Sequence, residues 1–191
     1  MKALEEKILS DGQILPGNVL KVGSFLNQQL DPDLLMAMGR EIARLFADAG
    51  VTRILTVEAS GIAIALAAAV EMHVPAVFAK KGRTTNLSND VYCATVHSYT
   101  HNTDCPLMVD KSFIKPDDRV LIVDDFLAVG NALNGLISLV GQAGAVVVGC
   151  AAAIEKAFQK GGDTLRASGI RVESLALIES MTDDSIVFGT R

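Results

Sequence analysis

The sequence predicts an α/β protein built on a parallel twisted sheet that is flanked by helices. Short apolar runs of strand length alternate with longer helix-like segments along the whole chain. Hydrophobic residues make up 50% of the chain but aromatic residues only 5%, so the core rests on small aliphatic side chains that suit strands buried on both faces. We expect a single domain over residues 1–191, because no linker or internal repeat divides the chain.

The first half of the chain is expected to supply one strand–helix–strand unit. Residues 1–10 are amphipathic and residues 13–30 are irregular. Asp31 before Pro32 is a strong helix start, since Asp caps the first turn and Pro suits its first position. The elements expected next are a helix over 33–49 that ends at Gly50, a strand over 51–57, an alanine-rich helix up to Glu71 and a strand over 75–79.

The second half opens with a long polar segment, residues 80–118, which has no helical periodicity. Segments of this kind are usually functional or mobile. Short hairpin strands are expected in it, around 91–96 and 107–109. The elements expected after it are a buried strand over 120–123, a helix over 133–140, and strands over 145–153 and 172–178.

Residues 120–133, which read VLIVDDFLAVGNAL, are the most informative segment. Asp124 and Asp125 stop the apolar run, and a turn of small residues then opens the helix. Helix N-termini hold phosphate through backbone N–H groups, and carboxylates accept hydrogen bonds from sugar hydroxyls. The segment therefore predicts a site for a phosphorylated sugar, although an ordinary strand–turn–helix whose aspartates cap the helix remains open. The turn consists of Ala128, Val129, Gly130, Asn131 and Ala132.

This order of residues resembles the signature of the type I phosphoribosyltransferases, which bind the ribose 5-phosphate of phosphoribosyl pyrophosphate (PRPP). The common form of the family has Thr at the positions of Val129 and Ala132, so here backbone amides and the Asn131 side chain must suffice. The xanthine branch of the family also lacks these threonines and carries an FLA-x-G-x-A loop, as this chain does. The resemblance implies the family fold, with a small N-terminal hood contributed by about residues 1–30.

Two further strand ends carry residues that suit an anion. Ala59, Ser60 and Gly61 let backbone N–H groups approach closely, and the resemblance implies that they hold the pyrophosphate of PRPP. Without the resemblance, an ordinary tight turn would be favoured. The run Lys80-Lys81-Gly82-Arg83 would stabilise the leaving pyrophosphate, with Lys81 favoured as the contact, and a solvated basic turn is the alternative.

A third set of residues concerns the purine base. Lys156, in the pair Glu155-Lys156, would donate to the 6-oxo group, with Phe158 as an apolar wall; a surface salt bridge beside a core Phe is the alternative. The resemblance implies that Leu20 and Asn27 form the hood over the base. An amide such as that of Asn27 donates to a 2-oxo group, which distinguishes xanthine from hypoxanthine.

The function implied by the resemblance is purine salvage, in which xanthine and PRPP give xanthosine 5′-monophosphate and pyrophosphate. Asp124 and Asp125 would be the catalytic residues. Mg²⁺ is expected on the substrate oxygens, without dedicated protein ligands, and the protein is expected to be a homodimer. Two alternatives stay open: a phosphoribosyltransferase for hypoxanthine or guanine, and a non-catalytic PRPP-binding regulator of purine metabolism.

Composition argues against several other classes. The formal charge of −5 and pI of about 5.1 give no support to a nucleic-acid partner. The longest apolar stretches, 62–70 and 145–154, fall short of the ~18 residues of a membrane span. Three cysteines without C-x-x-C spacing, and an acidic N-terminus unlike a signal peptide, favour the cytoplasm. His73, His97 and His101 form no metal-ligand spacing and are assigned no role.

Overall fold

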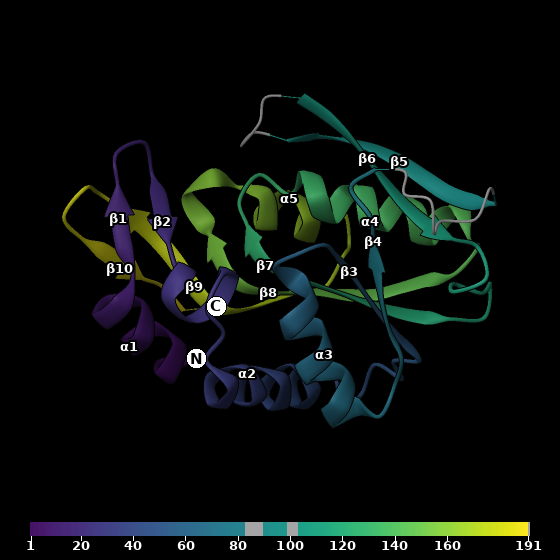
Figure 1. The fold of residues 1–191 in the computed structure, drawn as a ribbon, viewed down its shortest axis with the longest axis horizontal. Coiled ribbons are helices and arrows are strands. Elements are labelled where there is room, and N and C mark those ends of the chain that lie inside the picture. Colours follow the sequence, from purple (N-terminus) through teal and green to yellow (C-terminus); the bar gives the residue numbers. More distant parts are fainter. Residues whose placement is uncertain (83–89, 99–102, 191) are drawn as a thin grey trace.

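Figure 1 shows the fold in a computed structural model, which describes residues 1–82, 90–98 and 103–190. The elements in chain order are α1 (Lys2–Asp11), β1 (Gln13–Leu15), β2 (Val19–Lys21), the π-helix η1 (Gly23–Asn27), α2 (Pro32–Leu45), β3 (Arg53–Val57), α3 (Gly61–Met72), β4 (Ala76–Ala79), β5 (Val91–Ser98), β6 (Thr103–Asp110), β7 (Arg119–Leu127), α4 (Asn131–Gln142), β8 (Val146–Lys156), the 3₁₀ helix η2 (Ala157–Gln159), α5 (Gly161–Ala167), β9 (Val172–Met181) and β10 (Ile186–Phe188).

The central sheet confirms the predicted class. Its six strands run in the order β10-β9-β8-β7-β3-β4, and every neighbouring pair is parallel except β10 with β9. The chain leaves β3 through α3 toward β4, whereas it leaves β7 through α4 toward β8 in the opposite direction. Such a reversal between adjacent strands opens a crevice beyond their carboxyl ends, where ligands of open α/β sheets bind.

Helices cover both faces of this sheet. In Figure 1, α2 and α3 lie below the sheet and α4 lies above it. Each side has its own apolar core, with Met38, Ile42 and Ile64 buried on the first and Leu133, Leu136 and Leu139 on the second. The strands between the two layers are buried on both faces, which explains their continuous apolar runs.

The start of α2 agrees with the sequence, but its end does not. The Asp31 side chain accepts a hydrogen bond from the Leu34 N–H at 3.1 Å, as an N-cap residue does. The helix ends at Leu45 instead of Ala49, because the chain turns at Phe46, which is only 2% exposed. Burial of this ring therefore outweighs the helical pattern of the next three residues, and Gly50 (φ +59°) follows the turn.

Three other expectations need correction. The strand predicted over 120–123 is β7, which continues to Leu127 because β8 pairs with it as far as Glu155. Asp124 and Asp125 therefore lie within the strand and do not end it. The short helix α5 and the antiparallel edge strand β10 were not expected, since each is too short to show a period in the sequence.

Two small hairpins complete the structure. β5 pairs with β6 over eight residue pairs, which lengthens the hairpin that the sequence predicts. β1 pairs with β2 around the predicted turn at Pro16-Gly17, and η1 follows. We call β1, β2 and η1 (residues 13–27) the hood segment, because they lie within the predicted hood.

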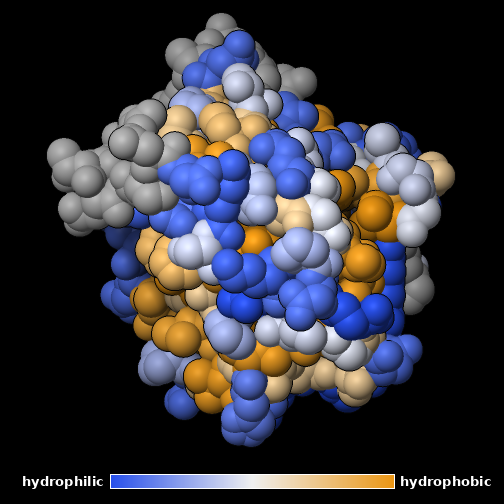
Figure 2. Space-filling view, turned by 90° about the vertical axis from the view of Figure 1, so that its right-hand side faces the viewer, coloured by the Kyte–Doolittle hydropathy of each residue, from blue (hydrophilic) through white to orange (hydrophobic). Residues whose placement is uncertain are grey.

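The surface mixes polar and apolar side chains. Figure 2 shows the end of the molecule that lies at the right of Figure 1, where apolar groups gather at several places among polar ones. Leu66 and Val70 of α3 and Phe78 of β4 are 58%, 50% and 42% exposed. Within the described residues, no helix has the length and apolar character needed to cross a membrane.

Candidate active site

The predicted site residues gather where β3 and β7 end. The loop 58–61 follows β3, Lys81 follows β4, and the turn 128–132 follows β7. Because β3 pairs with both β4 and β7 in parallel, these three ends open on the same edge of the sheet. The sequence-predicted anion-binding segments therefore meet at the reversal point of the sheet.

The two aspartates differ in burial. Asp124 is 4% exposed and accepts a 3.0 Å hydrogen bond at Oδ1 from the Asp125 N–H, whereas Asp125 is half-buried. Burial and the charge of Asp125 raise the pKa of Asp124 well above its ordinary value, and Lys81 opposes this to a smaller extent. Neither aspartate caps α4, whose N-cap residue is Gly130, so the helix-capping alternative is wrong.

A buried thiol lies close to the same carboxyl group. Burial, and then the charge of Asp124, raises the pKa of Cys150 to about 12. The thiol therefore stays protonated at neutral pH and behaves as a structural side chain.

The turn 128–132 forms the start of α4. Gly130 has φ +90°, a left-handed conformation that glycine adopts at no steric cost, and Asn131 and Ala132 already belong to the helix. Val129 is 37% exposed. The turn thus places backbone N–H groups at the N-terminus of a 12-residue helix, which suits a phosphate.

The loop after β3 is held close to the carboxylates. The Glu58–Ala59 peptide bond is cis. A Cβ atom on Gly61 would overlap Thr56 Oγ1 and lie 3.1 Å from Asp124 Oδ1, so glycine is required there. The Lys81 N–H donates to Glu58 Oε1 at 2.7 Å, which ties the end of β4 to this loop. Arg83, the third cation of the predicted basic run, lies outside the described residues, as does His101.

The predicted purine residues come from the hood segment and from the end of β8. Asn27 Nδ2 donates to Asp125 Oδ2 at 3.0 Å. Lys156 Nζ donates to the Asn18 carbonyl at 2.7 Å and lies 5.5 Å from the centre of the Phe126 ring. Burial lowers the pKa of Lys156. Leu20 is 6% exposed, and its side chain belongs to the core.

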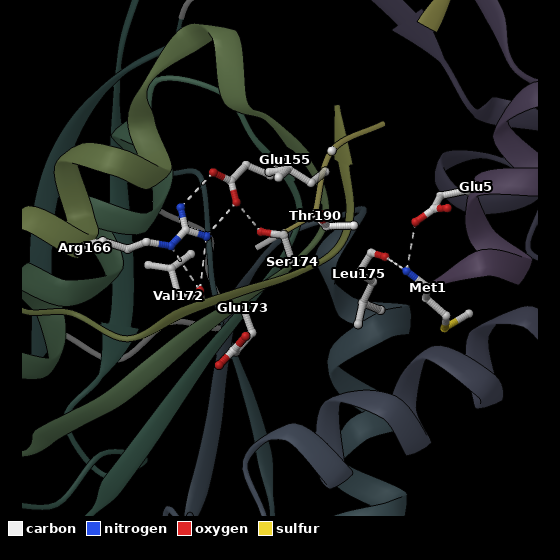
Figure 3. Close-up of a pocket in the computed structure, with 11 residues that line it drawn as sticks. Met1, Glu5, Glu155, Arg166, Val172, Glu173, Ser174, Leu175 and Thr190 are labelled. Atoms are coloured by element: carbon white, nitrogen blue, oxygen red, sulfur yellow. Dashed lines mark hydrogen bonds and ion pairs between the residues drawn. The ribbon is translucent and has the colours of Figure 1, made fainter. Parts of the chain in front are cut away.

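The side chains of Glu155 and Lys156 point in different directions, and Glu155 lines a separate cavity next to Arg166. Figure 3 shows its carboxylate paired with Arg166 of α5, with Oε1–Nη1 and Oε2–Nη2 distances of 2.9 and 2.8 Å. Ser174 of β9 also donates to Oε2. Because Glu155 is fully buried, the surface salt bridge considered from the sequence is wrong. Phe158 packs, half-buried, against the core.

Sequence reasoning missed Arg166, Gly161 and Phe126. One signal was present for the glycine: Gly161-Gly162 opens a helix, where two glycines are unfavourable unless close packing requires them. Arg166 offered no signal, because the pairing with Glu155 depends on how β8 and α5 meet. Phe126 stood beside the signature aspartates but was assigned no role.

The fold and this site define a class of protein: an α/β protein whose site beyond the ends of β3 and β7 suits a phosphorylated sugar. A family model described as the phosphoribosyl transferase domain matches residues 27–180. The chain therefore belongs to the phosphoribosyltransferase family, as the signature predicted.

Two relatives cover almost the whole chain. A protein of Lactiplantibacillus plantarum named xanthine phosphoribosyltransferase is 50% identical over 190 residues, which are 100% of this chain and 97% of the relative. A protein of the same name from Lactobacillus delbrueckii subsp. bulgaricus is 52% identical over 188 residues, which are 98% of this chain and 100% of the relative.

Solved structures agree on the fold. The adenine phosphoribosyltransferase of Trypanosoma brucei, solved with AMP, pyrophosphate and ribose-5-phosphate, has a TM-score of 0.77 at 19% identity and covers 95% of this chain and 82% of its own. The enzyme of Giardia lamblia, complexed with 9-deazaadenine, has a TM-score of 0.76 at 21% identity, covering 93% and 98%. At these identities the comparison supports the architecture alone.

Proposed function

We propose that the protein transfers the phosphoribosyl group of PRPP to xanthine, giving xanthosine 5′-monophosphate and pyrophosphate. The choice of base rests on the relatives named xanthine phosphoribosyltransferase, which are 50% and 52% identical to this chain over nearly its full length. The site supports the transfer chemistry, because adjacent carboxylates and a helix N-terminus meet at the reversal point of the sheet.

The proposed reaction is a displacement at the anomeric carbon of the ribose. The purine N9 forms a bond to this carbon as the bond to the pyrophosphate oxygen breaks; pyrophosphate leaves with that electron pair, and the imidazole N–H proton of the purine passes to solvent water. Asp124 and Asp125 accept hydrogen bonds from the ribose hydroxyls and stabilise the positive charge that develops on the sugar. The turn 128–132 holds the 5-phosphate, so that remote binding energy orients the reacting carbon.

The leaving pyrophosphate gains negative charge during this step. Small residues at Ala59, Ser60 and Gly61 let backbone N–H groups approach it, and Lys81 supplies a cation. The hydrogen bond from the Lys81 N–H to Glu58 supports this pairing, because it fixes the lysine next to the loop.

The purine is proposed to lie between the hood segment and the end of β8. Lys156 donates to its 6-oxo group, Asn27 donates to its 2-oxo group and the Leu20 backbone completes the contact. The support is spatial: Asn27 contacts Asp125, while Lys156 contacts the hood carbonyl of Asn18 and lies 5.5 Å from the centre of the Phe126 ring.

Mg²⁺ fits a site of this kind as a companion of the substrate. Among the described residues, no group of three or more His, Cys, Asp or Glu side chains comes together as a metal cage. The two adjacent carboxylates do suit a hard cation that brings its own pyrophosphate and water oxygens. When bound, Mg²⁺ neutralises charge on the pyrophosphate, while the chain's residues orient the sugar and the base.

We propose a cytoplasmic homodimer. The exposed apolar side chains of Leu66 and Val70 on α3, and of Phe78 on β4, support an interface on that side of the molecule. The double variant Leu66→Glu/Val70→Glu should be monomeric in analytical ultracentrifugation. A monomeric wild-type protein would contradict the proposal.

The experiment that tests the function is a spectrophotometric assay with PRPP, Mg²⁺ and each of xanthine, hypoxanthine, guanine and adenine. Preferred turnover of xanthine is the expected result. Turnover of hypoxanthine or guanine would keep the chemistry but contradict the base. PRPP binding without turnover of any base would point to a regulatory protein.

A further inference from the structure

Helix α5 touches the phosphate-binding turn through Gly161. The Gly161 N–H donates to the Ala128 carbonyl at 3.0 Å. A Cβ atom on Gly161 would lie 2.7 Å from the Gly130 nitrogen and closer still to the Ala128 carbonyl oxygen. These are backbone atoms, which cannot move without a change in the turn itself. Gly161 therefore packs directly against the backbone that is proposed to hold the 5-phosphate.

The same helix is hydrogen-bonded to the end of β8 through Arg166. Its guanidinium binds both oxygens of Glu155, and its Nε and Nη2 also donate to the Val172 carbonyl at 3.2 and 3.1 Å. Figure 3 shows this pair forming one wall of a cavity of about 210 Å³. Because each guanidinium nitrogen already has a protein acceptor, the arrangement suits a structural clamp better than a ligand site.

A second close approach completes the clamp. A Cβ atom on Gly162 would lie 2.6 Å from Arg166 Nη1 and 2.7 Å from Glu155 Cδ. Glycine at this position lets the backbone of α5 lie against the ion pair. Gly161 thus contacts the turn 128–132, and the adjacent Gly162 contacts the Glu155–Arg166 ion pair.

The Glu155–Arg166 ion pair affects the proposed base contact because Glu155 and Lys156 are neighbours in one strand. Successive strand residues point to opposite faces. Here Glu155 points to α5, while Lys156 points to the hood carbonyl and the Phe126 ring. A buried carboxylate must keep its partner, since an unpaired buried charge is strongly unfavourable. Holding Glu155 against α5 therefore fixes the direction in which Lys156 leaves the strand.

We propose that α5 is the positioning element that sets the geometry of both substrates at once. Gly161 fixes the shape of the phosphate-binding turn, and Arg166 fixes the end of β8 through Glu155. Neither residue touches a substrate. The inference rests on the proposed function, because it takes the turn 128–132 and Lys156 as the PRPP and purine contacts.

The Gly161 half is tested by calorimetric binding of PRPP. Gly161→Ala should raise the Kd for PRPP about tenfold or more, because the new methyl group displaces the turn. Its KM for xanthine at saturating PRPP should stay within about twofold. Gly141→Ala is the matched control, since Gly141 lies in α4 with no atom within 4 Å of the added Cβ. If Gly161→Ala does not fold, Leu165→Val removes packing beneath Gly130 in its place.

The Arg166 half is tested by Arg166→Lys, which keeps a cation for Glu155 but loses the two-pronged pairing. It should raise the KM for xanthine about fivefold and leave the Kd for PRPP within about twofold. Arg44→Lys is the control, because Arg44 makes a similar two-pronged pair with Glu41 on the exposed surface of α2. Thermal unfolding midpoints of all variants show whether a change in Kd or KM comes from a less stable fold or from displaced substrate-binding residues.

The two substrates should therefore respond to different ends of the same helix. If the wild type turns xanthine over but both folded variants keep both constants within twofold, α5 is only structural and the inference is overturned. If the wild type binds PRPP but turns over no base, the proposed function fails; a weaker PRPP Kd in Gly161→Ala would still support the turn-positioning role. A wild type that binds no PRPP would overturn both.

Discussion

The side-chain amide of Asn27 donates a 3.0 Å hydrogen bond to the carboxylate of Asp125, 98 residues further along the chain. This bond joins the hood segment to the strand that carries the proposed catalytic pair. The side chain proposed to read the base is therefore next to the carboxylate proposed to hold the ribose. In the proposed reaction, a ribose hydroxyl takes the place of the amide at Asp125, and the amide then donates to a purine oxygen.

Replacement of Asn27 should alter base preference more than overall rate. Asn27→Ala removes the donor proposed for the 2-oxo group, so the KM for xanthine should rise about tenfold while that for hypoxanthine stays nearly constant. Steady-state kinetics with both bases measure this, with the neighbouring Gln29→Ala as control. Equal losses for the two bases would contradict the assignment.

The half-buried aspartate should act mainly on the chemical step. Asp125→Asn keeps the size of the side chain but removes the charge that stabilises the developing cation. The value of kcat should fall about a hundredfold or more, while the Kd for PRPP changes by less than about fivefold. Single-turnover kinetics together with calorimetry separate the two effects, and an unchanged kcat would refute this role.

The buried aspartate should reduce stability as the price of its position. Its raised pKa means that, from about pH 4 up to that pKa, the folded state binds more protons than the unfolded state, so stability falls as pH rises. Asp124→Asn should therefore raise the Tm at pH 8 by about 3 °C, with the gain vanishing near pH 4. Calorimetry over this range measures it, with Asp117→Asn as an exposed control. A lower Tm at pH 8 would contradict the burial argument.

A second buried aspartate, at the opposite end of β7, should have the reverse effect. Asp118 accepts hydrogen bonds from Arg53 Nε and the Lys115 N–H, both at 2.7 Å, and from Thr52 Oγ1 at 3.0 Å. Burial tends to raise the pKa of Asp118, but these bonds outweigh it and the pKa is lowered.

Stabilisation by Asp118 is therefore full above about pH 4 and is lost as pH falls through the lowered pKa. Asp118→Asn should lower the free energy of unfolding by about 2–4 kcal/mol at pH 7, and this loss relative to the wild type should become smaller in acid. Urea unfolding at several pH values tests this, again beside Asp117→Asn. A difference that grows in acid would show that another group dominates.

The central sheet was predictable from the sequence because the residue types of its strands show that the strands are buried. Residues 54–57 and 120–123 are buried without alternation, and all of them except Thr56 are apolar, as expected of strands covered on both faces. The start of α2 was also predictable, because the Asp31 cap acts within one turn of the chain. Each of these signals is local.

The parts that were missed depend on contacts between distant segments. The last turn expected of α2 gives way to burial of Phe46, and Arg171 packs over that ring from the start of β9, 4.6 Å from its centre. The partner of Glu155 is a residue eleven positions later, in a helix too short to show periodicity. Among the site residues, the Asn27–Asp125 contact could not be read from either segment alone. Three-dimensional packing decided each case.

The hood segment is anchored from below. Phe25 and Leu26, which directly precede Asn27, are fully buried in the core. The rim of the proposed base pocket is thus continuous with the interior and does not behave as a detachable flap. Evolution of a new base preference would then act most readily on outward-facing atoms such as the Asn27 amide, because a larger redesign of this rim would also replace core side chains and cost stability.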